Sequence, residues 1–160
     1  MLLSGQDRKL LAAIARFQMY RDRSGIWAWG QRTRSKGAYM FWSIISGSDI
    51  HRDAKIDPST RFPHLSGVVV HQDAIVEKNC LIMQQVTLGQ TAVPGAPHLG
   101  ENVYVGAGAK ILGAVKIGAR AKIGANAVVL TDIPADATAV GVPAQTITQA
   151  QSDKPKDDRR

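Results

Sequence analysis

A six-residue rhythm of apolar positions runs through the chain from about residue 50 to residue 134. One break, between Val86 and Leu99, divides the rhythm into two runs. The apolar positions are Ile50, Ile56, Phe62, Val68, Ala74, Cys80, Val86, Leu99, Val105, Ile111, Ile117, Ile123 and Val129. A small or β-branched residue follows four places later at Ala54, Thr60, Ser66, Val103, Ala109, Val115, Ala121 and Ala127.

A period of six fits neither the 3.6-residue face of an α-helix nor the two-residue alternation of a flat strand. It fits a coil with three short sides, in which each side takes six residues and directs one apolar residue inward. Eighteen residues then make one coil, stacked coils pair their backbones in parallel, and the repeat predicts about four coils. The alternative, a β-sandwich with coincidental spacing, is disfavoured because all thirteen positions are apolar.

The two ends of the chain lack this rhythm. Leu10, Leu11, Ile14 and Phe17 recur at helical spacing, which predicts a helix over about residues 5–22 with Ser4 and Asp7 near its cap. The apolar stretch from Tyr39 to Ile45 predicts a second, short helix. We therefore expect a helical cap over residues 1–46, a β-helix over residues 47–147 and a disordered charged tail over residues 148–160.

The charge of +7 at pH 7 is concentrated near the N-terminus, because residues 1–45 carry eight Lys and Arg against two Asp. Trp27, Trp29, Tyr39 and Trp42 lie among these basic residues. This mixture suits a peripheral contact with an anionic membrane through residues 16–45, although a plain cap over the first coil is the favoured interpretation. The sequence has no run of about 18 apolar residues and no signal peptide, so we expect a cytoplasmic protein, with any membrane contact at the inner face. We expect no nucleic-acid partner.

Three segments make the sequence similar to a known family. They are Val105-Gly-Ala-Gly-Ala-Lys-Ile-Leu-Gly113, Ile117-Gly-Ala-Arg-Ala-Lys-Ile-Gly-Ala125 and Gly141-Val-Pro-Ala144. Over about residues 47–147 the chain resembles the hexapeptide-repeat acyltransferases, and within them the serine acetyltransferases. The resemblance implies an all-β fold, a left-handed parallel β-helix, together with acetyl-CoA as donor and homotrimers whose active sites lie between neighbouring subunits.

Acetyl transfer to a hydroxyl needs a general base, for which histidine is suited. His64 falls where serine acetyltransferases carry their catalytic histidine, and Asp49 falls where they carry its aspartate partner. The resemblance thus implies His64 as base and Asp49 as the residue that fixes its tautomer; the alternative for His64 is a surface histidine at a coil corner. His98 lies in the loop that holds a second active-site histidine in the family, but Ala96 takes the aligned place, so its role stays open between catalysis and surface.

The remaining histidines and the single cysteine have simpler interpretations. His51 and His71 are expected at the surface, and Cys80 is expected in the core because it occupies an inward position. The separations between successive histidines, 13, 7 and 27 residues, do not match the three-histidine zinc site of β-helix carbonic anhydrases. We therefore expect no metal.

The family also implies where acetyl-CoA binds. The matching small residues are Ala107, Ala125 and Gly89, which let an extended ligand approach the backbone. Lys122 and Lys110 are candidates to reach the CoA phosphates, with solvated surface lysines as the alternative.

The residues that would bind the acceptor depart from the family pattern. Serine acetyltransferases bind the charged ends of serine with an aspartate directly before the catalytic histidine and with an arginine in the loop. This chain has Pro63 at the first place and no arginine between Gly89 and Pro97. We therefore favour a sugar unit of a surface polysaccharide as acceptor. Serine O-acetylation, as in cysteine biosynthesis, is the alternative, and a non-catalytic or metal-binding β-helix trimer is the alternative of another class.

Overall fold

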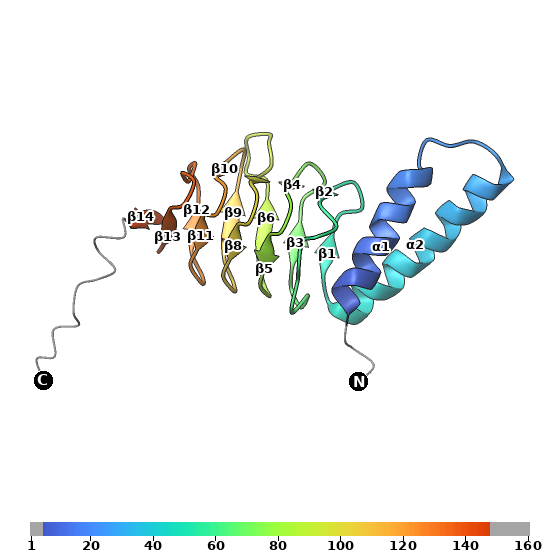
Figure 1. Cartoon of the computed structure of the whole chain (residues 1–160), viewed down its shortest axis with the longest axis horizontal. Helices are drawn as coiled ribbons and strands as arrows, with labels where there is room; N and C mark the ends of the chain where they lie inside the picture. The colour runs from blue at the N-terminus through green and yellow to red at the C-terminus, as the bar shows by residue number, and fades with distance from the viewer. Residues whose placement is uncertain (1–4, 148–160) are drawn as a thin grey trace, which may run out of the picture.

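The computed structural model of the chain describes residues 5–147, so Ser4 and the expected tail over residues 148–160 lie outside the described residues. Two helices, α1 (Gln6–Tyr20) and α2 (Ile26–Ser46), precede a stack of short strands (Figure 1). The strands are β1 (Asp49–Ile50), β2 (Lys55–Ile56), β3 (Val69–Val70), β4 (Ile75–Val76), β5 (Leu81–Ile82), β6 (Thr87–Gly89), β7 (His98–Leu99), β8 (Tyr104–Val105), β9 (Lys110–Leu112), β10 (Lys116–Ile117), β11 (Lys122–Ile123), β12 (Val128–Val129), β13 (Thr138–Val140) and β14 (Gln145–Ile147).

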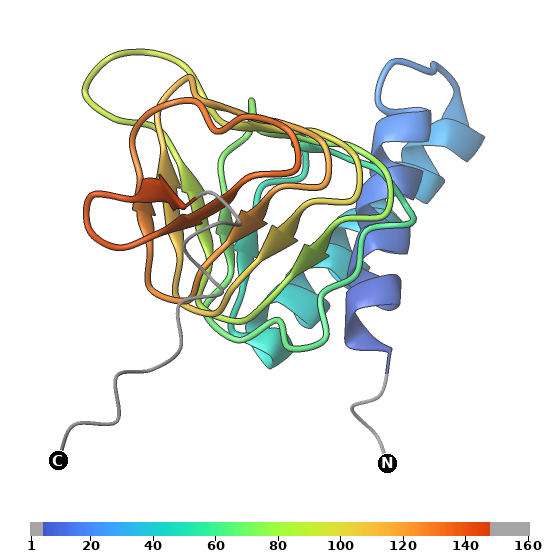
Figure 2. The ribbon, with the colours of Figure 1, turned by 60° about the vertical axis from the view of Figure 1, so that its left-hand side comes forward.

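The strands form the three sides of a prism. Sheet A has the order β1-β3-β6-β9-β12, sheet B the order β10-β7-β4-β2, and sheet C the order β14-β13-β11-β8-β5. Neighbouring strands are parallel, except that β14 folds back antiparallel on β13. Because the chain visits the three sheets in turn, it winds as a coil (Figure 2). The predicted class, a left-handed parallel β-helix behind a helical segment, is confirmed.

Side chains from all three sheets fill the centre of the prism. Every predicted apolar position is buried except Ile56, which is half-buried and packs against the core next to α1. Cys80 is buried as expected. The core is therefore a column of apolar layers that runs the length of the coil.

The phase of the repeat differs from the prediction in the middle of the chain. Ile50 pairs with Val70 and not with Val68, so the first coil takes two residues more than eighteen. From there to the break, Val70, Val76, Ile82 and Leu88 are the strand residues that point inward, whereas Val68, Ala74, Cys80 and Val86 fill the corners. Both sets are buried and apolar, so a count of every sixth residue cannot distinguish them. Sheets A and C each contain five strands, so the expected number of about four coils was too low.

The helical segment differs from the prediction in its second half. Helix α1 matches the expected helix within two residues at each end, but α2 is 21 residues long and not a short helix near Tyr39. The first part of α2 has no continuous apolar stripe, because Gly30 and Gly37 interrupt it and Trp27 and Trp29 are exposed. Helical periodicity therefore gave no signal there.

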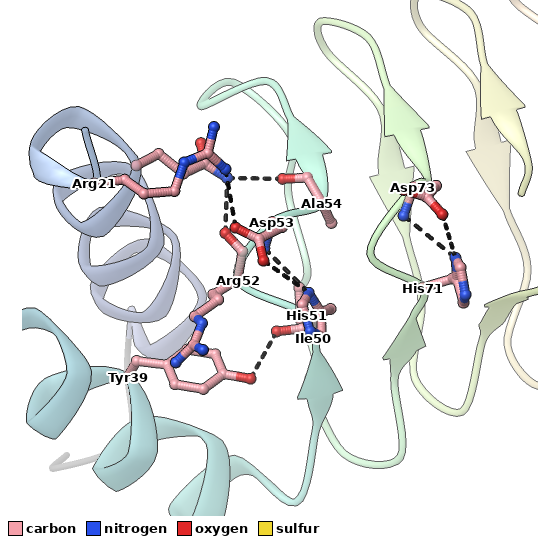
Figure 3. Close-up of polar contacts among 10 residues, drawn as sticks. Arg21, Tyr39, Ile50, His51, Arg52, Asp53, Ala54, His71 and Asp73 are labelled. Carbon is pink, nitrogen blue, oxygen red and sulfur yellow. Dashed lines mark hydrogen bonds and ion pairs between the residues drawn. The ribbon is translucent and has the colours of Figure 1, made fainter.

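The two helices lie across the first coil and hold it through polar contacts. The Gln18 amide donates to the carbonyls of Arg52 and Ala54 at 2.8 and 3.0 Å. The Tyr39 hydroxyl donates to the Ile50 carbonyl at 3.0 Å, and Arg21 pairs with Asp53 at 3.1 Å (Figure 3).

The break in the repeat, residues 90–97, contains no strand and joins β6 of sheet A to β7 of sheet B. It leaves the prism as a loop at the corner between these sheets (Figure 2). Residues 90–94 are exposed. Neither α1 nor α2 is long and apolar enough to span a membrane.

Candidate active site

His64 lies on a corner of the prism that we call the C/A corner, formed by the turns that lead from sheet C to sheet A. Successive turns are joined by backbone hydrogen bonds of 2.8–2.9 Å, from Gly67 to Gly47, Gln85 to Ser66, Gly108 to Gln84 and Asn126 to Ala107. The turns therefore stack into one continuous ridge along the coil. The extra residues of the first coil fall in the turn that carries His64.

Asp49 and His64 lie on successive coils at this corner. Phe62 is anchored in the core, and His64 follows it as an exposed residue of the turn. Asp49 is the exposed residue of β1, and its N–H donates to the Val68 carbonyl at 2.8 Å. Within residues 5–147, no hydrogen bond or ion pair joins the two side chains. The structure thus brings the predicted pair into one neighbourhood and leaves the imidazole open to a ligand.

A cavity of about 840 Å³, which we call the His64 groove, separates this turn from the start of α1. Gly5 and the first residues of α1, 6–8, line one side, residues 61–66 line the other, and Ile45 and Ser46 complete it. Inside the groove, Asp7 accepts a hydrogen bond from the Phe62 N–H at 3.4 Å and lies 3.6 Å from Arg61 Nε. Asp7 is therefore not the helix cap predicted from the sequence, since α1 begins after Gly5 without a side-chain cap. The periodicity of the sequence does not relate residues 55 positions apart. The sequence therefore did not predict that Asp7 and Arg61 lie in the same groove as His64.

The predicted CoA-binding residues Ala107 and Ala125 lie on the same corner as His64, one and two coils beyond the turn of Gln84. Their turns are tightly packed: a Cβ added to Gly106 would lie 2.6 Å from the Ala125 nitrogen. Lys122 is exposed on β11 of sheet C, beside this ridge. Lys110 is less available to a CoA phosphate, because its ammonium group donates a hydrogen bond to the Gln85 carbonyl at 2.6 Å.

Gly89 and His98 lie away from His64 within one chain. Gly89 is the last residue of β6, at the corner between sheets A and B where the loop begins. His98 is on β7 of sheet B, and its Nε2 lies 2.8 Å from Glu77 Oε1 of the preceding coil. It lines a separate cavity of about 380 Å³. A single chain does not unite these residues with His64.

His51 and His71 occupy matching turns of successive coils (Figure 3). The Nδ1 of each accepts a hydrogen bond of 3.2 Å from the backbone N–H two residues later, at Asp53 and Asp73. Both histidines are half-buried and hold their own turns together. Among the residues described, no group of three or more His, Cys, Asp or Glu side chains could hold a metal ion.

Cys80 is unsuited to act as a nucleophile. Its side chain is buried, its thiol donates to the Gly100 carbonyl at 3.1 Å, and burial raises its pKa above the ordinary value. A thiol held protonated in this way is unreactive.

Comparison with known proteins agrees with the repeat. Residues 96–131 match the family model described as bacterial transferase hexapeptide (six repeats). Together with the prism of parallel coils, this match defines the class of the β-helix, that of the hexapeptide-repeat transferases.

Within that class the chain is serine acetyltransferase-like. It is 42% identical over 141 residues to the serine acetyltransferase of Escherichia coli K12, covering 85% of this chain and 52% of that protein. It is 42% identical over 129 residues to the serine acetyltransferase of Mycobacterium tuberculosis H37Rv, covering 79% and 56% of the two chains.

Solved structures agree. A serine acetyltransferase in complex with CoA matches with a TM-score of 0.72 and 37% identity, and soybean serine acetyltransferase complexed with serine matches with a TM-score of 0.77 and 35% identity. Each match covers 91% of this chain and 59% of the other. The chain therefore spans only about half the length of the curated relatives that it matches.

Proposed function

We propose that this protein transfers an acetyl group from acetyl-CoA to the hydroxyl of an acceptor. The observation that carries the proposal is the 42% identity to serine acetyltransferases, which extends over 85% of the chain. The position of His64 on an open corner beside a groove of about 840 Å³ supports it. The geometry and the relatives thus indicate the same chemistry.

The reaction needs one proton to move twice. His64 takes the proton of the acceptor hydroxyl as the oxygen attacks the thioester carbonyl, and the resulting imidazolium returns a proton to the CoA thiolate that leaves. Asp49, on the preceding coil, stabilises the imidazolium and selects its tautomer. Among the described residues, no side chain forms a hydrogen bond or ion pair with the His64 imidazole. A bound acceptor can therefore approach it directly.

The ridge of small residues at the C/A corner suits the pantetheine arm of CoA. Ala107 is half-buried and Ala125 is exposed, and neither carries a side chain larger than a methyl group. An extended ligand can therefore hydrogen-bond to the backbone. Lys122, exposed beside the ridge, supplies positive charge for the phosphates.

The complete site requires a second copy of the chain. Gly89, His98 and the loop over residues 90–97 lie at the corner between sheets A and B, at the opposite end of the sheet A strands from the C/A corner. In a homotrimer, the A/B corner of one copy can face the C/A corner of the next. This arrangement supports sites shared between neighbouring subunits.

Serine is the acceptor that the comparisons favour. The relatives are serine acetyltransferases, and one similar structure is complexed with serine. This evidence opposes the preference for a polysaccharide sugar that Pro63 and the arginine-free loop suggested. A sugar hydroxyl remains the second candidate because of those same two features.

An acceptor screen tests the proposal. Release of free CoA thiol from acetyl-CoA is followed with serine, with neutral and acidic nucleotide sugars and with oligosaccharides. We expect acceptor-dependent release that is fastest with serine. Release that depends on a sugar and not on serine would replace the acceptor, and absence of release with every hydroxyl compound would contradict acetyl transfer.

A further inference from the structure

The His64 groove contains an arginine whose position is fixed by the fold. The Arg61 N–H donates to the Cys80 carbonyl at 2.9 Å, and its own carbonyl accepts from the Ile82 N–H at 3.0 Å. These bonds hold residue 61 in register with β5 of sheet C. Because Phe62 points into the core, Arg61 points outward, three residues before His64.

Asp7 holds one edge of the Arg61 guanidinium. The pair is formed through Nε at 3.6 Å, and the Asp7 side chain is 10% exposed whereas that of Arg61 is 56% exposed. Among residues 5–147, no side chain or carbonyl accepts a hydrogen bond from the two terminal nitrogens of Arg61. The guanidinium is thus oriented at its inner edge and free at its outer edge.

The charge of the groove favours an anion. Arg8 also lines it, so the groove that His64 lines contains two arginines and one carboxylate, that of Asp7. The residue directly before His64 is Pro63, which has neither a charge nor an N–H to offer a ligand. Within this groove, the charged side chains next to His64 are those of Asp7, Arg8 and Arg61.

We propose that Arg61 binds a carboxylate of the acceptor and thereby selects acceptors that carry one. A planar guanidinium pairs with a carboxylate through two parallel hydrogen bonds, and the groove of about 840 Å³ has room for such a molecule beside His64. The carboxylate can belong to an amino acid such as serine or to an acidic sugar. This inference rests on the proposed acetyl transfer, because it assigns the acceptor to the groove beside the proposed base.

The test compares the wild-type chain with Arg61→Gln and Arg61→Lys, with Arg34→Gln as a matched control, since Arg34 is an exposed arginine on α2 that does not line the groove. Binding of serine, serinamide, glucuronic acid and glucose is measured by calorimetry, and thiol release is measured in parallel. Loss of a charge-assisted bidentate pair weakens binding about ten- to a hundredfold. We expect that loss in R61Q for the carboxylated ligand, a smaller loss in R61K, and none in R34Q.

The two acids distinguish the source of the carboxylate: preference for serine over serinamide identifies an amino acid, and preference for glucuronic acid over glucose identifies a sugar. Unchanged binding and KM in R61Q, or no discrimination between acids and their neutral analogues by the wild-type chain, would overturn the proposal. Because calorimetry measures binding without turnover, it separates failure of the Arg61 proposal from failure of the proposed acetyl transfer. Carboxylate binding that needs Arg61 without any thiol release would contradict acetyl transfer alone.

Discussion

At the scale of single residues, glycine sets how closely the coils can stack. A Cβ on Gly118 would lie 2.3 Å from the Ala135 nitrogen and 2.7 Å from its Cα, both backbone atoms of the next coil. Backbone cannot yield as a flexible side chain can. The glycines that follow inward apolar residues therefore mark close contacts between coils, which the repeat signalled without revealing the partner.

We expect Gly118→Ala to destabilise the protein by about 1–3 kcal/mol, the usual cost of overpacking. Gly37→Ala is the control, because nothing lies within 4 Å of a Cβ added there on α2, and alanine favours the helix by about 0.5–1 kcal/mol. Denaturant unfolding monitored by circular dichroism measures both. A G118A variant as stable as the wild type would contradict the packing.

Cys80 gives a prediction about pH. Burial raises the pKa of its thiol in the folded state, so the unfolded chain loses the proton first as the pH rises. Its contribution to stability is therefore complete below the unfolded pKa of about 8.5 and is lost as the pH rises toward the folded value. We expect slow labelling by a thiol reagent at pH 7–8 that becomes rapid in denaturant; rapid labelling of the folded protein would show an accessible thiolate.

At the scale of elements, the strands were more predictable than the helices. The six-residue rhythm located the coils because each hexad places apolar side chains in the core, as at Ile111 and Ile117. It could not detect the two extra residues near His64, because Val68 and Val70 are both apolar and buried. Helix α2 begins well before the apolar stretch that predicted it. The glycines and exposed aromatic residues in its first half carry no periodic signal.

Helix α2 also bears on the predicted membrane contact. Ile26, Trp27 and Trp29 are 87, 65 and 61% exposed, and residues 1–45 carry most of the net charge. Apolar side chains beside basic ones favour an anionic bilayer surface.

We expect the protein to sediment with anionic phosphatidylserine vesicles at low salt and not with neutral vesicles. A Trp27→Ala/Trp29→Ala variant should lose most of this binding, whereas Trp42→Ala serves as a half-buried control. Equal sedimentation of the wild-type protein with both kinds of vesicle, or none with either, would refute the membrane contact.

At the scale of the whole molecule, the two corners of the prism that flank sheet A carry different parts of the candidate site. Asp49, His64, Ala107 and Ala125 follow the C/A corner, whereas Gly89 and His98 lie toward the other side. The resemblance predicts these residues from their positions along the chain, but only the stack of coils reveals this separation. The neighbours of His64 that lie far away in sequence, Asp7 and Arg61, required the structure.

A trimer should have three times the 17.2 kDa mass of one chain. Sedimentation equilibrium at micromolar concentration measures this mass directly. A monomer with full activity would contradict the shared site, because one chain does not bring His98 and the loop to His64.

The central claim is that His64 is the base of an acetyl transfer from acetyl-CoA. Its most direct test is the rate of acceptor-dependent thiol release by His64→Ala, with His71→Ala as the matched control from a turn of the same coil stack. General-base catalysis contributes about a hundred- to ten-thousandfold to rate, so H64A should lose activity by that factor while H71A stays close to the wild type. Unchanged turnover in H64A would contradict the account.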